Sequence, residues 1–485
     1  MALGDVQSTL QLAARLTVTG FRGVDEASVE LTPVTIVTGR NNSGKSSLLE
    51  ALAIAASAAA GFRDWLGSDT IRYIVDGKLL GRPLRLIRSG HREAYVRFDH
   101  PLVRVNVVIR RPRDIREEAR RLACLAARSI NRVMAGFCVL GAVYVDKLNR
   151  RALDRAYALL GDAINSMGLL CSRPGAQLPG SMAEAVAEVL LEALTRAASR
   201  VVRESVRVEV SGGGEGRWGF TRIYYPGASR WKYLSKGVRV AVSEALGEVV
   251  NRLAEALQPV ELNSRELVDC LSRVLHDTLK KAIWESYGSP ETAGKPIRVY
   301  TLFHRVLSGN RDGLAKALTR VIQMLHSLGL LETYNSLIKN VPGLGVSDPF
   351  IEEGEVWFRA SGGRVPASLL GDGTLHLLLL FAGLALAKEG NVVLIYEEPE
   401  TGLHPGYMIV FAQQLAQVLS ENPGALIVLS THSLELIRYI ADAAREAGAA
   451  ELLTTVLIDN GGVFSTFHGE EVVEASELEI DLRGI

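Results

Sequence analysis

The chain has 485 residues, of which 48% are hydrophobic and 22% charged, and its Lys+Arg and Asp+Glu totals are both 54. This length allows a large core and two or three domains, and the composition excludes a disordered chain. The balanced charge gives no overall preference for an anionic partner.

Targeting signals and cysteines say little about partners. The first seven residues carry an acid and no basic segment, so no signal peptide is expected. The most apolar run, residues 377–387, is too short to cross a bilayer and predicts a buried helix. No C-x-x-C pair occurs, which favours free thiols and argues against zinc. These features predict a cytoplasmic protein without membrane attachment; its cysteines are Cys124, Cys138, Cys171 and Cys270.

The N-terminal segment has the pattern of a strand-rich lobe. Residues 12–31 alternate apolar and polar about a central turn, which predicts a β-hairpin. Residues 33–38 form a short β-branched run typical of a buried strand, and residues 46–56 favour a helix. Further strands are predicted at 94–98 and 103–109.

Between that strand and helix, residues 39–47 read GRNNSGKSS and fit G-x-x-x-x-G-K-[ST]. Two glycines let the loop bend so that its N–H groups face anionic oxygens. Lys45 is expected to reach the β- and γ-phosphates of ATP, and the Ser46 hydroxyl to ligate Mg²⁺. The flanking strand and helix make a chance glycine loop the weaker interpretation. The predicted nucleotide-binding residues are Gly39, Asn41, Asn42, Ser43, Gly44, Lys45, Ser46 and Ser47.

From about residue 113 to 340 the periodicity is mostly helical. Helices are predicted at 114–134, 150–167, 182–203, 236–257, 266–287 and 312–337, with strands at 205–210 and 220–225. No helix sustains heptads long enough for an extended coiled coil. The expected division is therefore an N-terminal lobe 1–112, a mostly helical insertion 113–340 and a C-terminal lobe 341–485.

The entrance to the insertion is basic: residues 82–155 hold about 18 Lys/Arg against about 7 Asp/Glu. Such an asymmetry can mark a nucleic-acid contact. A solvated helix surface is the plainer alternative, because the arginines show no consistent facing and few aromatic residues lie between them.

The C-terminal lobe returns to α/β character. Runs at 392–396, 425–429 and 453–458 predict buried strands that pair in parallel beside residues 34–37. The first run ends in Glu397 and Glu398, at the sheet edge where parallel strands place ligands, as in a Walker B segment.

The two acids are expected to divide the chemistry. Glu397 would belong to the Mg²⁺ shell, and Glu398 would orient the attacking water or accept its proton. Glu397 stands where Asp is usual, which leaves direct and water-mediated contact with the metal both open.

Two further segments complete the predicted site. His432, in the run LSTHS, follows the next strand and is expected to contact the γ-phosphate or the attacking water; an incidental histidine in a helix cap is the alternative. Gly371, Asp372 and Gly373 precede the apolar helix, whose N-terminus suits a phosphate. A plain loop is the alternative there.

Together these motifs resemble those of the ABC-type AAA ATPases, which include structural-maintenance-of-chromosomes heads and overcoming-lysogenisation-defect proteins. The resemblance covers residues 12–60 and 341–485, and residues 479–484 look like the tail of small prokaryotic members. It implies an α/β P-loop ATPase head assembled from both chain ends, with ATP and Mg²⁺ as cofactors.

The same resemblance implies a homodimer, in which Gly371, Asp372 and Gly373 of one copy contact the γ-phosphate held by the other. Many relatives have serine in the place of Gly371, so a hydroxyl contact is missing and weaker dimerisation is expected. No glutamine between residues 47 and 170 supplies the family's Q-loop residue.

The expected function is an ATP hydrolase whose dimer moves the insertion on a nucleic acid or a protein partner, in genome maintenance or defence. The alternative is an ATP-gated binding or scaffold module with little turnover. The long insertion disfavours a transporter ATPase. A Toprim nuclease domain is rejected, because only about fifty residues follow His432.

Overall fold

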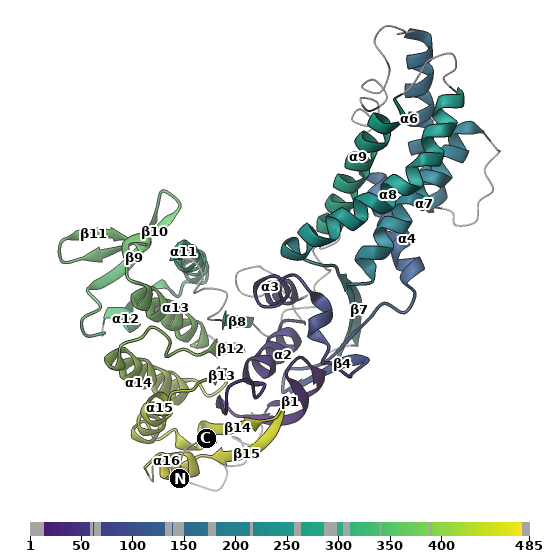
Figure 1. The fold of residues 1–485 in the computed structure, drawn as a ribbon. Helices are drawn as coiled ribbons and strands as arrows, with labels where there is room; N and C mark the ends of the chain where they lie inside the picture. Colours follow the sequence, from purple (N-terminus) through teal and green to yellow (C-terminus); the bar gives the residue numbers. More distant parts are fainter. Residues whose placement is uncertain are drawn as a thin grey trace.

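The computed structural model describes residues 14–58, 62, 69–130, 138, 150–172, 181–213, 217–256, 263–285, 298–303, 311–339, 341–388 and 390–477. The tail-like residues 479–484 lie outside these ranges. Figure 1 shows a two-lobed head from which an arm of helices projects. The head contains a six-stranded mostly parallel sheet, a small three-stranded sheet and a six-stranded antiparallel sheet that leads toward the arm.

The mostly parallel sheet has the strand order β15-β14-β3-β13-β12-β8. Its strands are β3 (Val34–Thr38), β8 (Arg298–Phe303), β12 (Val392–Glu397), β13 (Leu426–Ser430), β14 (Leu453–Asp459) and β15 (Gly462–His468). Only the β14–β15 pair is antiparallel. Every residue of β3, β12 and β13 is buried, which explains their continuous apolar sequences. The predicted parallel pairing beside residues 34–37 is confirmed.

Helices cover both faces of this sheet (Figure 1). Alternate residues of one strand enter different cores: Leu394 and Tyr396 pack in the same core as helices α11 to α15, whereas Val393 and Ile395 pack in the core of α2. The helices of the head are α2 (Lys45–Ala58), α3 (Thr70–Gly77), α11 (Arg311–Ser327), α12 (Leu331–Lys339), α13 (Asp372–Ala387), α14 (Pro405–Glu421), α15 (Leu434–Glu446) and α16 (Glu470–Glu477). No helix of the described chain is long and apolar enough to cross a membrane.

The antiparallel sheet has the order β2-β1-β4-β5-β6-β7. It consists of β1 (Ala14–Phe21), β2 (Val24–Leu31), β4 (Glu93–His100), β5 (Val103–Arg110), β6 (Val206–Gly213) and β7 (Trp218–Tyr224). The predicted N-terminal hairpin is confirmed by the β1–β2 pairing. Because β6 pairs with β5, strands from within the insertion extend the sheet of the N-terminal lobe.

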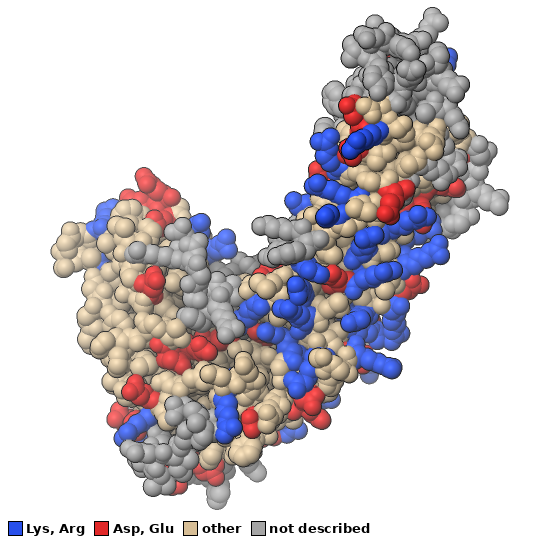
Figure 2. All heavy atoms as spheres, in the orientation of Figure 1, with Lys and Arg blue, Asp and Glu red and all other residues tan. Residues whose placement is uncertain are grey.

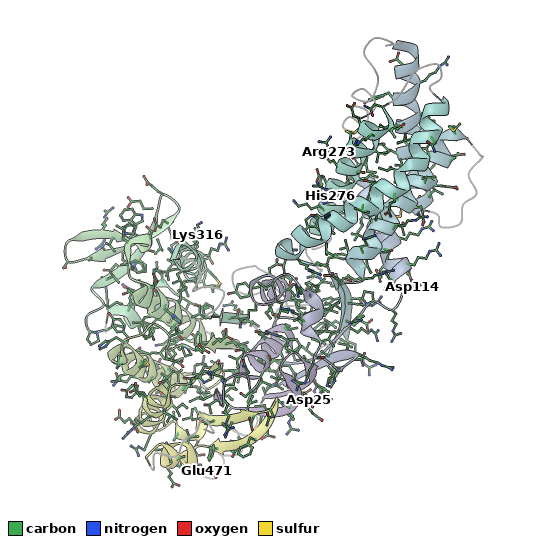
Figure 3. The ribbon with its side chains drawn as sticks, in the orientation of Figure 1. Asp25, Asp114, Arg273, His276, Lys316 and Glu471 are labelled. Carbon is green, nitrogen blue, oxygen red and sulfur yellow. A yellow bond between two sulfur atoms is a disulfide. The ribbon has the colours of Figure 1, made fainter. Side chains whose placement is uncertain are left out.

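The arm has a hydrophobic core of its own. It contains α4 (Ile115–Arg128), α6 (Arg150–Ser172), α7 (Met182–Val202), α8 (Ala228–Ala256) and α9 (Ser264–Glu285). In Figure 3, Asp114 marks the start of α4 and His276 lies on α9. The Asp114 carboxylate caps α4 by accepting hydrogen bonds from the backbone N–H groups of Arg116 and Glu117.

The last part of the predicted insertion packs with the head. β8 pairs with β12, and the residues of α11 and α12 share the core of the C-terminal lobe. The single helix predicted over 312–337 is wrong, because Gly329 has φ +73° and separates α11 from α12. We therefore propose that the projecting arm consists of helices α4 to α9, within residues 114–285, without β6 and β7, which belong to the sheet of the N-terminal lobe. The boundary at residue 340 stays a prediction.

The C-terminal lobe also carries a small meander of β9 (Val346–Glu352), β10 (Glu355–Ala360) and β11 (Gly363–Pro366). Short 3₁₀ turns lie at Pro83–Leu86, Ala367–Leu369 and Ala450–Leu452. The meander packs on α11 and α12 and was not predicted.

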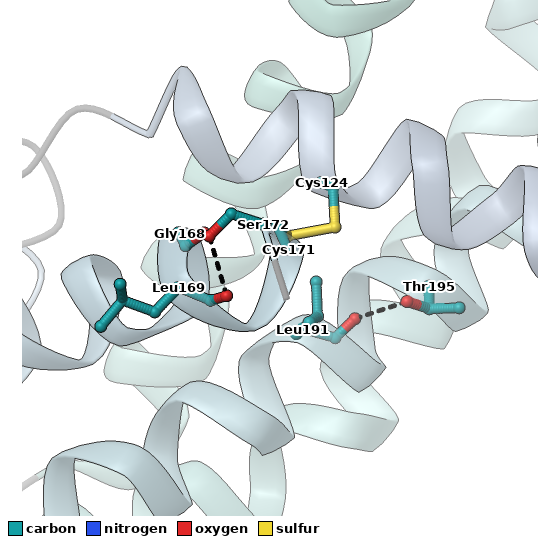
Figure 4. Close-up of a disulfide and its surroundings, with 7 residues drawn as sticks. All are labelled: Cys124, Gly168, Leu169, Cys171, Ser172, Leu191 and Thr195. Atoms are coloured by element: carbon teal, nitrogen blue, oxygen red, sulfur yellow. Dashed lines mark hydrogen bonds between the residues drawn. A yellow bond between two sulfur atoms is a disulfide. The ribbon is translucent and has the colours of Figure 1, made fainter. Parts of the chain in front are cut away.

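The free-thiol prediction is wrong. Disulfides join Cys124 to Cys171 and Cys138 to Cys270, with Cα–Cα distances of 5.5 and 5.4 Å. Figure 4 shows the first bond, between α4 and α6. The pairs are 47 and 132 residues apart, so only helix packing brings them together. The cytoplasmic prediction therefore loses the support it drew from free thiols.

Candidate nucleotide-binding site

The loop at residues 39–47 joins β3 to α2 and is held from two sides. Gly39 has φ +138°, and a Cβ there would lie 2.1 Å from the backbone oxygen of Ile458, so only glycine fits. The Ser43 carbonyl accepts a hydrogen bond from the Gly461 N–H at 2.9 Å. On the other side, the Ser47 hydroxyl accepts one from the Gly23 N–H at 3.2 Å. The turns of both neighbouring hairpins therefore fix this loop.

Lys45 lies inside the curve of the loop. Its Nζ donates hydrogen bonds to the carbonyl oxygens of Gly39 and Arg40, at 2.9 and 2.7 Å. Burial lowers the pKa of Lys45 to about 8, and the charges of Glu398 and Glu400 partly oppose that shift. Of the other predicted loop ligands, Asn41 and Asn42 are exposed, Ser46 is half-buried, and Ser43, Gly44 and Ser47 are buried.

Glu398 and His432 face each other at the carboxyl ends of β12 and β13. The Glu398 backbone has φ +50°, an uncommon conformation for a non-glycine residue, and its N–H donates to the Ser430 carbonyl at 2.9 Å. His432 Nε2 lies 3.8 Å from Glu398 Oε1, with both side chains more than a third exposed. The structure therefore brings Lys45, Glu398 and His432 to one edge of the sheet.

Glu400 was not assigned a role from the sequence, yet it fixes the loop that carries His432. Its carboxylate accepts hydrogen bonds from the Thr431 hydroxyl at 2.6 Å and the His432 N–H at 3.0 Å. Burial raises the pKa of Glu400, which these hydrogen bonds oppose. Its place as the third acid of the run EEPE was the available signal.

Glu397 has a partner that the sequence did not reveal. The Nζ atom of Lys78 lies 2.7 and 2.6 Å from its two carboxylate oxygens, and 3.0 Å from Glu50 Oε1. Glu50 also pairs with Arg22. Lys78 and Glu397 are 319 residues apart, so no local pattern could have indicated the contact.

The hydroxyls around this edge fit a site that a ligand completes. In the described chain, the side-chain oxygens Thr38 Oγ1, Ser43 Oγ and Ser430 Oγ are buried without a hydrogen-bond partner. No group of three His, Cys, Asp or Glu side chains there could hold a metal alone. Oxygen donors such as Ser46 and Glu397 suit Mg²⁺, which keeps waters and phosphate oxygens as its other ligands.

Gly371, Asp372 and Gly373 lie elsewhere on the C-terminal lobe. Gly371 is the N-cap of α13, and both it and Asp372 are exposed. A Cβ on Gly373 would come within 2.5 Å of the Gly402 carbonyl oxygen. Gly373 therefore lies beside the turn that follows Glu400, whereas a Cβ on Gly371 would meet open space.

Two family models match the chain. One, described as AAA ATPase domain, matches residues 14–80, and the other, described as AAA domain, putative AbiEii toxin, Type IV TA system, matches residues 332–438. The first match includes the loop at 39–47, and the second includes Gly371, Glu397, Glu398 and His432.

Relatives and solved structures were also found. An uncharacterised protein of Methanocaldococcus jannaschii is 30% identical over 117 residues, which are 24% of this chain and all of the relative. The head domain of SMC from Thermotoga maritima is 11% identical with a TM-score of 0.33, and covers 94% of this chain and 98% of that one. The SMC head bound to the C-winged helix domain of ScpA is 10% identical with a TM-score of 0.38, and covers 96% and 99%.

The family matches at both ends, on either side of the arm, define the class: the head carries AAA ATPase domain segments and is similar to the ATPase heads of the ABC-type AAA ATPases. The α/β fold with a head assembled from both chain ends, expected from the motifs, is confirmed. It is a nucleotide-binding protein of that class.

Proposed function

We propose that the protein hydrolyses ATP at this sheet edge. The observation that carries the proposal is the convergence of Lys45, Glu398 and His432 around partnerless buried hydroxyls. Lys45 would exchange its two loop carbonyls for β- and γ-phosphate oxygens, while the loop N–H groups hold the phosphate chain. ATP would bring Mg²⁺, held by Ser46 and Glu397, to shield phosphate charge.

The attacking water would be oriented by Glu398, which is exposed enough to reach solvent and stands beside His432. His432 would contact the γ-phosphate, with its backbone held by Glu400. The uncommon backbone conformation of Glu398, with φ +50°, turns the chain at the end of β12 and so helps to orient its carboxylate.

A second copy would complete the site. The exposed N-terminus of α13, with Gly371, Asp372 and Gly373, offers partial positive charge to the γ-phosphate held by the other copy. Leu369, just before this loop, is 68% exposed, which supports a surface that a partner covers. ATP would thus join two heads.

The test is steady-state phosphate release by the wild type and by Glu398→Gln. We expect measurable turnover in the wild type and a loss of about 100-fold or more in the variant, with nucleotide binding retained. Sedimentation with Mg²⁺ and ATP should show the variant, which cannot clear ATP, as a dimer of the 52.5 kDa chain. If both proteins bind nucleotide but neither releases phosphate, the proposal that the protein hydrolyses ATP is wrong.

One observation favours the alternative, an ATP-gated binding module with little turnover. Both oxygens of Glu397 are engaged by Lys78, so this carboxylate already has a cation. A metal contact through water would then be weaker, and hydrolysis slower. ATP-dependent dimerisation with undetectable phosphate release would select this function.

As partner we propose a nucleic acid bound along the arm. Exposed arginines gather before and on α4 and on the adjoining α7: Arg111, Arg113, Arg116, Arg120, Arg128, Arg196, Arg200 and Arg203. Figure 2 shows basic side chains along the arm and its base. Within the described chain, ion pairs engage Arg196 but not Arg116, Arg120 or Arg200. Of the two expected processes, the toxin–antitoxin description of one matched family favours defence.

The arm proposal is tested with duplex DNA, single-stranded DNA and RNA over a salt series. The double variant Arg116→Glu, Arg120→Glu should bind at least about tenfold more weakly and lower the salt slope by about two. Its control, Arg364→Glu with Arg438→Glu, makes the same charge change on the head. If no nucleic acid alters binding or ATP turnover, the arginines form a plain surface and the protein partner remains.

A further inference from the structure

A buried network of two acids and two cations links the nucleotide site to α3. The side chain of Lys78, the C-cap of α3, is 3% exposed and contacts Glu397 and Glu50, and Arg22 pairs with Glu50 on the other side. The network holds two positive and two negative charges. Moving any one of these side chains away would leave a buried charge unpaired, so we expect the four side chains to keep their contacts or to move together.

The network makes Glu397 sensitive to a second cation. A divalent ion drawn to Glu397 would meet the positive charge of Lys78 at the same carboxylate. Either Lys78 moves away, or the metal stays one water further out. In the first case the position of Lys78 responds to the charge on the nucleotide side of Glu397; in the second case Lys78 keeps its place and sets how closely the metal can approach.

Both ends of α3 contact the base of the arm. At the N-cap, the Asp69 carboxylate accepts hydrogen bonds from Arg222 Nη1 at 3.1 Å and from the Tyr224 hydroxyl at 2.8 Å, both on β7. Just past Lys78, the Gly81 carbonyl accepts one from the Gly227 N–H at 2.9 Å, immediately before α8.

The contact at Gly227 leaves no free space. A Cβ on Gly227 would lie 1.6 Å from Asp76 Oδ1 and 3.1 Å from the Gly81 Cα. Asp76 belongs to α3, so the start of α8 is seated directly on this helix. In Figure 1, α3 lies between α2 of the head and the lower end of the arm.

We infer that Lys78 is a positioning residue for Glu397, and that α3 carries its displacement to the base of the arm. A helix of two turns pinned at both ends moves as one body, so a shift at Lys78 reaches Asp69, Gly81 and Gly227. This inference rests on the proposed function in that it needs a metal-bound nucleotide at Glu397. The route from that ligand to the arm then runs through Glu397, Lys78 and α3.

The test compares Gly227→Ala with Gly247→Ala. Both lie at or on α8, but a Cβ at Gly247 meets open space. Two readouts apply to each: the ratio of nucleotide Kd in EDTA to Kd in Mg²⁺, and deuterium exchange of β7 and the first turns of α8 with each ligand. By linkage, Gly227→Ala should change the Kd ratio about fivefold or more, and Gly247→Ala should not.

A second pair addresses Lys78 itself. In the wild type and in Lys78→Arg, Mg²⁺-nucleotide should change the exchange of α8 relative to nucleotide in EDTA, and Lys78→Met should abolish that response. If Lys78→Met does not fold, the comparison of Gly227→Ala with Gly247→Ala still tests whether α3 carries the response to the arm. A Gly227→Ala protein with wild-type Kd ratio and wild-type exchange response would overturn the inference. Failure of the wild type to bind nucleotide at all would instead refute the proposed function.

Discussion

Lys45 shows how a single buried residue makes the site sensitive to pH. The lysine is 6% exposed and points at two loop carbonyls, so water stabilises its charge poorly. Its pKa of about 8 means that the ammonium starts to lose its proton in the slightly alkaline range. The unfolded chain, with a lysine pKa of 10.5, binds the proton more tightly, so the Lys45 contribution to stability rises between pH 8 and 10.5.

Nucleotide binding should show the opposite trend. Because phosphate oxygens require charged Lys45, the affinity for a non-hydrolysable ATP analogue should fall above pH 8, approaching about tenfold per pH unit. Fluorescence titration from pH 7 to 9.5 measures this slope. Lys45→Ala serves as control and should bind weakly at every pH without the slope. A slope that survives in Lys45→Ala would assign the titration to another group.

At this scale the sequence predicted the residues whose roles depend on a local pattern. Lys45, Glu398 and His432 follow strand ends, and strand ends of a parallel sheet meet at one edge, so their meeting was predictable. The role of Lys78 was not predictable, because Glu50 and Glu397 become its neighbours only through the packing of α3 against α2 and β12. Glu400 was visible in the motif, but its bond to the His432 N–H depends on a backbone turn that no residue type specifies.

At the scale of elements, the hydrophobic pattern predicted the strands that are buried on both faces and the helices that have a clear apolar stripe. β3, β12 and β13 were found for that reason. β8 was missed because its six residues, RVYTLF, include polar positions and follow no apolar run. α3 was missed because two turns are too short to establish a period.

The disulfide between α4 and α6 gives a prediction at this scale. Reducing the protein, or replacing Cys124 and Cys171 together by Ala, should lower the free energy of unfolding of the arm by roughly 2–4 kcal/mol. The pair Cys138 and Cys270 closes a longer loop and should cost about 1 kcal/mol more. Urea unfolding, followed by deuterium exchange of α4 and α6 for the first pair and of α9 for the second, measures both.

The head supplies the internal control for this experiment. Exchange of β3 and α2 should not change, because neither disulfide touches the core of the head. Non-reducing peptide mass spectrometry checks the pairing directly. Free thiols in the native protein, or an arm equally stable after reduction, would show that the pairs do not form.

For the whole molecule, the total numbers of acidic and basic residues do not show where the charges lie on the surface. Equal totals of 54 acidic and 54 basic residues gave no preference for an anionic partner, whereas the basic stretch at 82–155 indicated a local excess, and basic side chains do gather along the arm and its base. The same holds for chain order: the head is built from about the first hundred and last two hundred residues, β8 included, and residues between them supply β6 and β7 to its antiparallel sheet. Motif order predicted the assembly from both ends, and the strands at 205–210 and 220–225 were also predicted, whereas the pairing of β6 with β5, which joins both to the sheet of the N-terminal lobe, was not.

The final prediction concerns the assembly of two copies through Gly371. Its φ of −66° suits any residue, and a Cβ there meets no atom within 4 Å, so serine fits without strain. As N-cap of α13, serine should leave the stability of the single chain within a few tenths of a kcal/mol of the glycine form. In the proposed dimer, its hydroxyl would add one hydrogen bond to a charged γ-phosphate of the other copy.

Such a bond contributes about 1.5–3 kcal/mol and forms at both sites of the symmetric dimer, so Gly371→Ser should tighten ATP-dependent dimerisation by roughly 100-fold or more. Sedimentation velocity in the Glu398→Gln background, with Mg²⁺ and ATP, measures the dimer dissociation constant. Gly371→Ala is the matched control, since it adds the same Cβ without the hydroxyl and should dimerise like the parent. Equal strengthening by alanine would assign the effect to helix α13, and no strengthening by serine would place Gly371 away from the γ-phosphate of the partner.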